Sequence, residues 1–128
     1  MNIQQLLDLT IQKHASDLHL SVGSPPTLRI HGELFPVPGE PPSTPQQIES
    51  LISSLTTDLQ KNIYHQVLEL DFSFEFESKA RFRANLYRQK GYPACALRFI
   101  PYFIPPLENL GLPNLVSKLI NLKQGFIL

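Results

Sequence analysis

Hydrophobic and polar residues alternate along the chain between residues 70 and 100, and this pattern predicts three neighbouring antiparallel strands. Every second side chain is aromatic or aliphatic, and most of the side chains between them are charged or polar. Such alternation is typical of a sheet with one buried face. The apolar positions are Phe72, Phe74 and Phe76 in the first strand, Phe82, Ala84 and Leu86 in the second, and Cys95, Leu97 and Phe99 in the third.

The register of the first two strands follows from the loop that joins them, because the apolar faces must coincide. We expect a three-residue loop at residues 78–80. It would form the pairs Phe76–Phe82, Phe74–Ala84, Phe72–Leu86, Glu77–Arg81 and Glu75–Arg83. The last two pairs join opposite charges across the strands and are therefore favourable.

The register of the second and third strands follows from a turn at residues 90–91, and it places Arg83 directly opposite Arg98. Two like charges in such a pair cost about 0.2–1 kcal/mol. One interpretation is that Glu75 neutralises Arg83 while solvent screens Arg98. The other is an anion site, because small Ala96 leaves open surface beside the pair and guanidinium groups bind phosphate in a bidentate manner.

The rest of the chain predicts helices and short strands, so the fold class is α+β with an antiparallel sheet packed by helices. Thr44 and Gln47 have the spacing of a capping box around Pro45, which suits the first position of a helix. The expected helices cover residues 3–14, 45–55, 58–67 and 114–122, and the expected strands cover 17–22, 28–30 and 34–37. Residues 101–113 contain four prolines and are expected to be irregular.

Composition excludes several classes of protein. The chain has 128 residues, which fits one domain, and its 11 basic and 11 acidic residues balance to zero net charge. We therefore expect no nucleic-acid partner.

Cys95 is the single cysteine and is expected to fill space in the core. Residues 125–128 are apolar, and we interpret them as the start of a strand that continues into a longer protein.

Three segments resemble the twitching-motility ATPases of type IV pili, the pilus retraction motors of the secretion ATPase superfamily. They are ASDLHLSVGSPPTLRIHGEL at residues 15–34, LDFSFEFESKARFRANLYRQKG at residues 70–91 and SKLINLKQGFIL at residues 117–128. The resemblance extends over essentially the whole chain, in order and at matching spacing. The short sequence before the first segment is more similar to the retraction motors than to the longer pilus-extension motors.

The resemblance implies a PAS-like domain over residues 1–122 and the start of a linker, or of the first strand of a RecA-like ATPase domain, at 123–128. The Walker motifs are not in this sequence, so ATP hydrolysis belongs to the full-length protein, with ATP and Mg²⁺, and we expect the isolated fragment to bind neither. The implied assembly is a homo-hexamer. It would be cytoplasmic and attached to the inner membrane through the pilus platform protein.

The resemblance also implies a role for three arginines. Arg83, in the RFRAN motif, and Arg98, in ALRFI, match residues that reach toward the ATP phosphates, and Arg81 ranks second because Glu77 flanks it. The phosphate charge would draw these arginines, and with them the whole domain, onto the ATPase domain of the same or a neighbouring subunit. Hydrolysis would then release them and let the domain move.

Two other functions remain open from the residues alone. One is a PAS-like module that binds a small ligand, and the other is a protein-docking module in which Phe103 and Ile104 are exposed between prolines. A metal site of Asp17, His19 and His31 is conceivable if Leu20 pairs with Ile30. We favour a structural role for all three and predict no metal.

Overall fold

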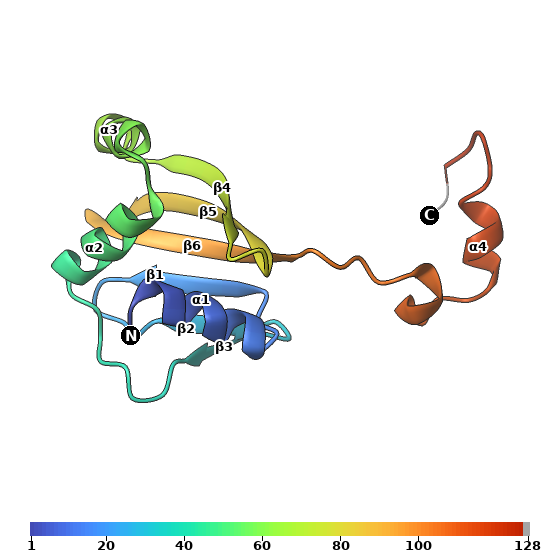
Figure 1. The fold of residues 1–128 in the computed structure, drawn as a ribbon, viewed down its shortest axis with the longest axis horizontal. Helices are drawn as coiled ribbons and strands as arrows, with labels where there is room; N and C mark the ends of the chain where they lie inside the picture. Colours follow the sequence, from blue (N-terminus) through green and yellow to red (C-terminus); the bar gives the residue numbers. More distant parts are fainter. Residues whose placement is uncertain (127–128) are drawn as a thin grey trace.

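A six-stranded antiparallel sheet forms the centre of the computed structural model, which describes residues 1–126. The strand order is β3-β2-β1-β6-β5-β4, so the two halves of the sheet meet where β1 pairs with β6 (Figure 1). The strands are β1 (Asp17–Ser21), β2 (Thr27–Ile30), β3 (Glu33–Pro36), β4 (Leu70–Phe76), β5 (Ala80–Gln89) and β6 (Tyr92–Pro101). The fold class is α+β, as predicted.

Three helices cover one face of this sheet and bury its apolar side chains. They are α1 (Ile3–Gln12), α2 (Pro45–Leu55) and α3 (Asp58–Val67). The core joins residues from these helices with the apolar positions of the strands, among them Leu6, Ile48, Tyr64, Leu18, Phe82, Leu86 and Leu97. The predicted capping box of Thr44 and Gln47 is present at the start of α2. The opposite face of the sheet carries the charged residues.

The β5–β6 register is the one predicted from the sequence. Lys90 and Gly91 form a two-residue turn with φ angles of 52° and 81°, as the primed hairpin turns require. Glycine adopts the positive φ of the second position without strain. The hairpin therefore pairs Arg83 with Arg98 across the two strands.

The predicted β4–β5 register is wrong by two residues. The loop comprises residues 77–79, so Phe74 pairs with Phe82 and Glu75 pairs with Arg81. Both Glu77 and Ser78 adopt positive φ angles, of 47° and 53°. Nothing in the sequence indicates this conformation, because neither residue is a glycine. A shift of two residues leaves every side chain on the same face, so the apolar pattern fits both registers equally well.

The pairing of Leu20 with Ile30, the condition for a metal site, does not occur. Leu18 pairs with Leu28, and His19 lies opposite Thr27. His31 falls in the turn between β2 and β3, where its φ is 50°. The three residues of the conceivable metal site are therefore not in the arrangement that such a site needs.

The C-terminal arm, residues 102–126, leaves the sheet at the end of β6 and extends away from the helices (Figure 1). It contains a short 3-10 helix, η1 (Leu107–Leu110), inside the segment that was predicted to be irregular. The helix predicted over 114–122 is present as the shorter α4 (Leu115–Leu119). None of its residues is buried, and Ile104 and Phe126 are each 85% exposed. The domain boundary at residue 122 stays a prediction, and the strand predicted at the end of the chain extends into residues 127–128, outside the described residues.

Candidate functional site

A row of charged side chains crosses the open face of the sheet on four adjacent strands. Arg83 on β5 lies opposite Arg98 on β6, Arg98 lies opposite Asp17 on β1, and Asp17 lies opposite Arg29 on β2. We call these four residues the arginine row. Residues directly opposite each other in antiparallel strands share a face, so the row is a consequence of register alone.

Asp17 is the acidic centre of the arginine row. Its Oδ1 accepts a hydrogen bond of 3.0 Å from Nε of Arg98, and its Oδ2 accepts one of 2.9 Å from Oγ of Ser16. Nε of Arg29 lies 3.6 Å from the same Oδ2. The Asp17 side chain is only 10% exposed, whereas that of Arg98 is 69% exposed. One buried carboxylate thus orients an arginine that is otherwise open to solvent.

Arg83 is oriented in a similar way by Asp71 on β4. Its Nε lies 3.5 Å from Oδ1 of Asp71, and its side chain is 65% exposed. Arg83 and Arg98 thus both face a carboxylate through Nε. Among residues 1–126, no hydrogen bond from the terminal nitrogens of either arginine is found. These nitrogens are the forked donors that bind phosphate or carboxylate in bidentate fashion.

A shallow hollow of about 230 Å³ lies between the two arginines. Its lining comprises Arg83, Arg98, Asp17, Asp71, Asn85 and Ala96. Ala96 lies opposite Asn85 and leaves room there, as the sequence predicted. The hollow is open to solvent and suits the end of a phosphate chain, held by two guanidinium groups and the Asn85 amide.

The electrostatics of the row keep Asp17 ionised. Burial alone would raise the pKa of Asp17, but hydrogen bonds from Arg98 and Ser16 and the Arg98 charge outweigh it and lower that pKa. The net effect indicates that the ion pair with Arg98 is the dominant electrostatic contact of this carboxylate.

His19 lies two residues after Asp17 on β1, and its pKa is lowered from the ordinary value. Burial lowers its pKa most, the positive charge of Arg29 lowers it further, and Asp17 only partly opposes this. Its Nε2 is buried without a hydrogen-bond partner among the described residues. Within residues 1–126, no group of His, Cys, Asp and Glu residues has the arrangement of a metal site.

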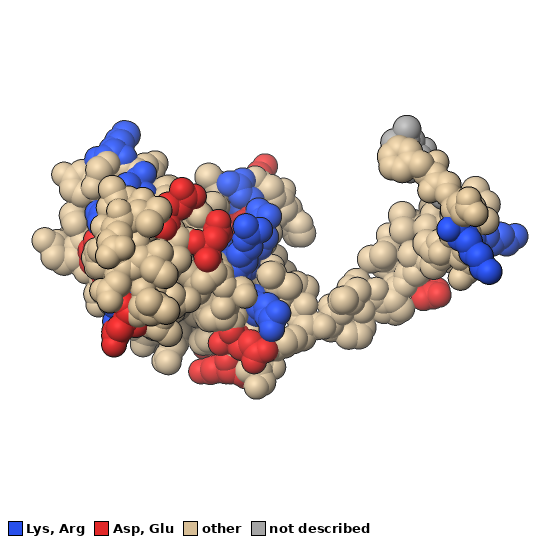
Figure 2. Space-filling model, turned by 90° about the horizontal axis from the view of Figure 1, so that it is seen from above, with Lys and Arg blue, Asp and Glu red and all other residues tan. Residues whose placement is uncertain are grey.

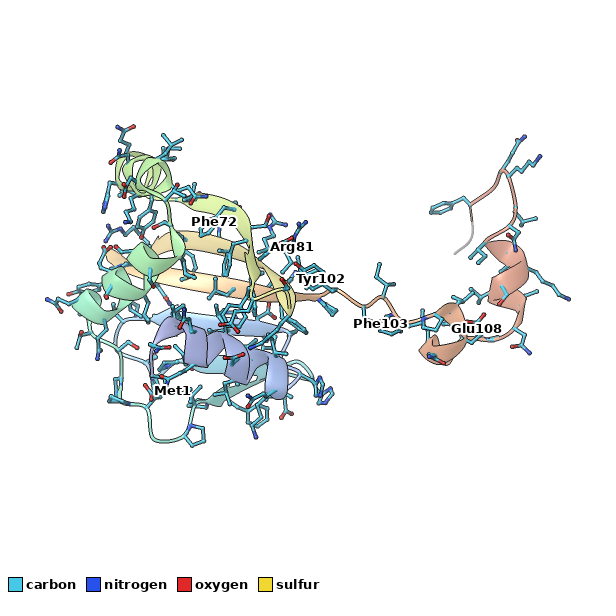
Figure 3. The ribbon with its side chains drawn as sticks, viewed as in Figure 1. Met1, Phe72, Arg81, Tyr102, Phe103 and Glu108 are labelled. Carbon is cyan, nitrogen blue, oxygen red and sulfur yellow. The ribbon has the colours of Figure 1, made fainter. Side chains whose placement is uncertain are left out.

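Arg81 lies on the same open face, two residues before Arg83. Its Nη2 donates to Oε1 of Glu75 at 3.4 Å, so one of its terminal nitrogens is engaged. It lines a separate open hollow, which it shares with Arg83. Figure 3 shows Arg81 at the end of the sheet where Tyr102 begins the C-terminal arm, and Figure 2 shows basic side chains gathered beside the root of that arm.

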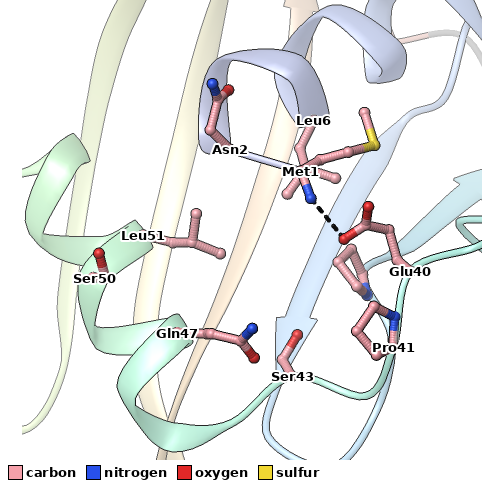
Figure 4. Close-up of a pocket in the computed structure, with 10 residues that line it drawn as sticks. Met1, Asn2, Leu6, Glu40, Pro41, Ser43, Gln47, Ser50 and Leu51 are labelled. Atoms are coloured by element: carbon pink, nitrogen blue, oxygen red, sulfur yellow. Dashed lines mark hydrogen bonds and ion pairs between the residues drawn. The ribbon is translucent and has the colours of Figure 1, made fainter.

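A second hollow, of about 300 Å³, lies on the helical side of the molecule. It is bounded by the starts of α1 and α2 and by residues 40–43 (Figure 4). The amino group of Met1 forms an ion pair of 2.7 Å with Glu40 at its rim. This hollow has no arginine in its lining and lies away from the arginine row.

The structure brings Arg83 and Arg98 together as predicted and places Arg81 on the same face, but the predicted counter-ions are wrong. The sequence predicts Glu75 beside Arg83 and solvent around Arg98, whereas the partners are Asp71 and Asp17. The pairing of β1 with β6 brings Asp17 to Arg98 across 81 positions of sequence, and no local pattern reveals it. An aspartate at the first position of an apolar strand was the available signal.

The fold and the arginine row define an α+β domain with an open sheet face suited to an anion. No family model matches the chain. The type IV pilus retraction ATPase PilT of Pseudomonas aeruginosa is 34% identical over 128 residues, which are 100% of this chain and 37% of that protein. The type IV pilus ATPase PilU of the same organism is 30% identical over 100% of this chain and 33% of its own length.

A solved structure of the pilus retraction motor PilT with bound ADP superposes with a TM-score of 0.78. It is 35% identical and is matched over 93% of this chain and 35% of its own. The chain is homologous to the N-terminal portion of the PilT and PilU type IV pilus ATPases. It spans about a third of the length of these relatives. Within the described residues, no helix is long and apolar enough to cross a membrane.

Proposed function

We propose that this chain is the N-terminal domain of a hexameric pilus retraction motor ATPase and that Arg83 and Arg98 bind the phosphates of ATP held by an ATPase domain. The observation that carries the proposal is the direct cross-strand pairing of these two arginines on an open sheet face. Each arginine has a carboxylate at its Nε, so the pair is tolerated, and its terminal nitrogens remain available to a further anion. Homology to the N-terminal portion of PilT supplies the setting.

The chemistry of this site is electrostatic. The hollow is shallow, so it suits only the terminal phosphates, and the rest of the nucleotide with its Mg²⁺ must be bound by the ATPase domain. The free terminal nitrogens of both arginines would hold the phosphate charge and draw the domain onto the nucleotide. Cleavage and loss of the phosphate would weaken this hold, and the domain would then move relative to the ATPase domain.

The C-terminal arm supports the presence of a further domain. Phe103 is 72% exposed, Ile104 is 85% exposed, and Leu115, Ile120 and Leu122 are each more than 60% exposed. Apolar side chains at this density normally pack against something. We propose that they pack against the ATPase domain of the same or a neighbouring subunit. The assembly would act in the cytoplasm at the inner membrane, on the pilus platform protein.

The test is to measure ATP turnover in the protein that joins this chain to its ATPase domain. Removing one arginine from a transferring phosphate lowers turnover by at least about tenfold, so we expect this for Arg83→Ala and Arg98→Ala and a smaller loss for Arg81→Ala. Lys61→Ala on α3 is the control, because its only ion pair among residues 1–126 is with Asp58 on the same helix. Size-exclusion chromatography establishes that the ring still assembles.

Normal turnover in both Arg83→Ala and Arg98→Ala, with normal rings, would refute nucleotide contact. In that case the domain would be a docking or small-ligand module. Loss of partner binding in Phe103→Asp with unchanged turnover would then favour docking, because Phe103 is exposed on the arm.

A further inference from the structure

We propose that Asp17 is an exchangeable counter-ion for Arg98. The Arg98 guanidinium pairs with Asp17 when no phosphate is bound, moves to the phosphate when nucleotide binds, and returns to Asp17 after the phosphate is released. Arg29 and Ser16 keep the carboxylate paired while Arg98 is away. This inference rests on the proposed function, because it concerns how the same arginine engages and leaves a phosphate.

The contacts of Asp17 are divided between its two oxygens in a way that permits this exchange. Oδ1 accepts only from Arg98 among the residues described, at 3.0 Å. Oδ2 accepts from Ser16 at 2.9 Å and lies 3.6 Å from Nε of Arg29. Departure of Arg98 would therefore empty one oxygen and leave the other paired.

The mobile partner in this pair is Arg98 and not Asp17. Asp17 is a short side chain, 10% exposed, at the start of a strand that is paired on both sides. Arg98 is a long side chain, 69% exposed, on the open face. A buried carboxylate that lost every partner would be strongly destabilising. Arg29, which faces Asp17 from β2, prevents this.

The charges around the hollow make the exchange reversible. Two arginines and two aspartates line it, Arg83 with Asp71 and Arg98 with Asp17, so their formal charges cancel. An arriving phosphate meets no net positive charge and must compete with Asp17 for Arg98. The arginine row would therefore hold a phosphate firmly enough to move a domain and loosely enough to release it in every cycle.

The experiment compares Asp17→Asn, Arg98→Gln and the double variant in the protein that joins this chain to its ATPase domain. The dissociation constant of a non-hydrolysable ATP analogue and kcat are measured for each. Removing the competing carboxylate should tighten analogue binding about 3- to 10-fold in Asp17→Asn, the size expected of one charge a few ångström away in a partly solvated site. Slower release of Arg98 should lower kcat at the same time.

Two controls separate exchange from a general charge effect. Glu49→Gln removes a carboxylate that pairs with Arg88 on β5 at 3.5 Å, away from the hollow, so binding should change less than about twofold. In the Arg98→Gln background, Asp17→Asn should also change binding less than about twofold, because no arginine remains to be exchanged.

Weaker analogue binding in Asp17→Asn, or an equal effect of Asp17→Asn and Glu49→Gln, would overturn the exchange. If Asp17→Asn fails to fold, Arg29→Gln tests the same idea. Without Arg29 the departure of Arg98 leaves Asp17 poorly paired, so binding should weaken several-fold, but only while Arg98 is present. Unchanged binding in Arg29→Gln would overturn the inference. If Arg98→Gln alone alters neither binding nor turnover, the proposed function itself fails.

Discussion

The two faces of the central sheet are built by the same strands, yet they differ in almost every physical respect. On β5, Phe82, Ala84 and Leu86 point to the helices and are each 0% exposed. The alternate residues Arg81 and Arg83 on the same strand point to the open face and are exposed. One alternating sequence thus produces a dry, packed surface and a wet, charged one within a single strand.

This difference teaches where stability and chemistry reside. Burial of apolar area stabilises the fold by about 25 cal/mol per Å², and it is concentrated on the helical face. Exposed ion pairs such as Arg83–Asp71 contribute about 0–1 kcal/mol. The open face can therefore be altered at little cost to stability, which leaves its arginines available for binding. Asp17 is the exception, because it is charged and buried at once.

The largest effect that this comparison predicts is the loss of Phe82. Its ring packs against Phe74 and Phe99 at centroid distances of 5.8 Å in both cases, and against Phe76 at 6.3 Å. Phe82→Ala would leave a cavity at the centre of this cluster and should lower the free energy of unfolding by about 3–5 kcal/mol. Urea unfolding followed by circular dichroism measures the change.

The neighbouring residue on the open face is the matched control for Phe82. Arg83→Ala removes another large side chain from the same strand, but one that is 65% exposed. The free energy of unfolding should change by less than about 0.5 kcal/mol. A decrease of more than about 2 kcal/mol in the free energy of unfolding of Arg83→Ala would contradict the idea that stability resides on the helical face.

The sequence predicted the β5–β6 hairpin correctly because its signals agree. Lys90 and Gly91 mark a two-residue turn, which leaves one register that places Ala84 against Leu97 on the apolar face. From this register the Arg83–Arg98 pair follows without further assumption. The central pair of the candidate site was therefore predictable from residues that lie close together in the sequence.

The counter-ions were not predictable because they depend on other registers. The β4–β5 register is determined by positive φ angles at Glu77 and Ser78, and no residue type there indicates them. Asp17 reaches Arg98 only because β1 inserts beside β6, a contact between distant parts of the chain. Alternation places a residue on a face, but it does not choose between registers that differ by two residues.

An intermediate effect on the free energy of unfolding is predicted for Asp17, because its side chain is both charged and buried. Its pKa is lowered in the folded chain, mainly by Arg98 and Ser16 acting against burial. A carboxylate with a lowered pKa stabilises the fold above its unfolded pKa, and this contribution is lost as the pH falls through the folded pKa. Asp17→Asn should therefore cost about 1 kcal/mol near pH 7, and the difference from the wild type should shrink as the pH falls below 3.8 toward the lower pKa of the folded chain.

The pH series of unfolding free energies that tests this uses Glu33→Gln as its control. Glu33 lies on the edge strand β3 and is exposed. Its substitution should leave the acid limb of the stability curve in place. If Asp17→Asn parallels the wild type at every pH, the carboxylate is not held in its charged form by the arginine row.

The smallest effect on the free energy of unfolding is predicted for His19. It tests whether water is excluded from this position on the open face. Burial and the charge of Arg29 lower the pKa of His19 below its ordinary value of 6.5. The unfolded chain then takes up a proton at higher pH than the folded chain, so the free energy of unfolding should fall as the pH drops below about 6.5.

His19→Gln should remove this slope, whereas His14→Gln, at an exposed position, should keep it. Urea unfolding between about pH 7 and pH 5 measures both. Equal slopes in wild type and His19→Gln would mean that the imidazole is solvated in the folded chain. The open face would then be wet at this position too, and its contrast with the dry helical face would be sharper.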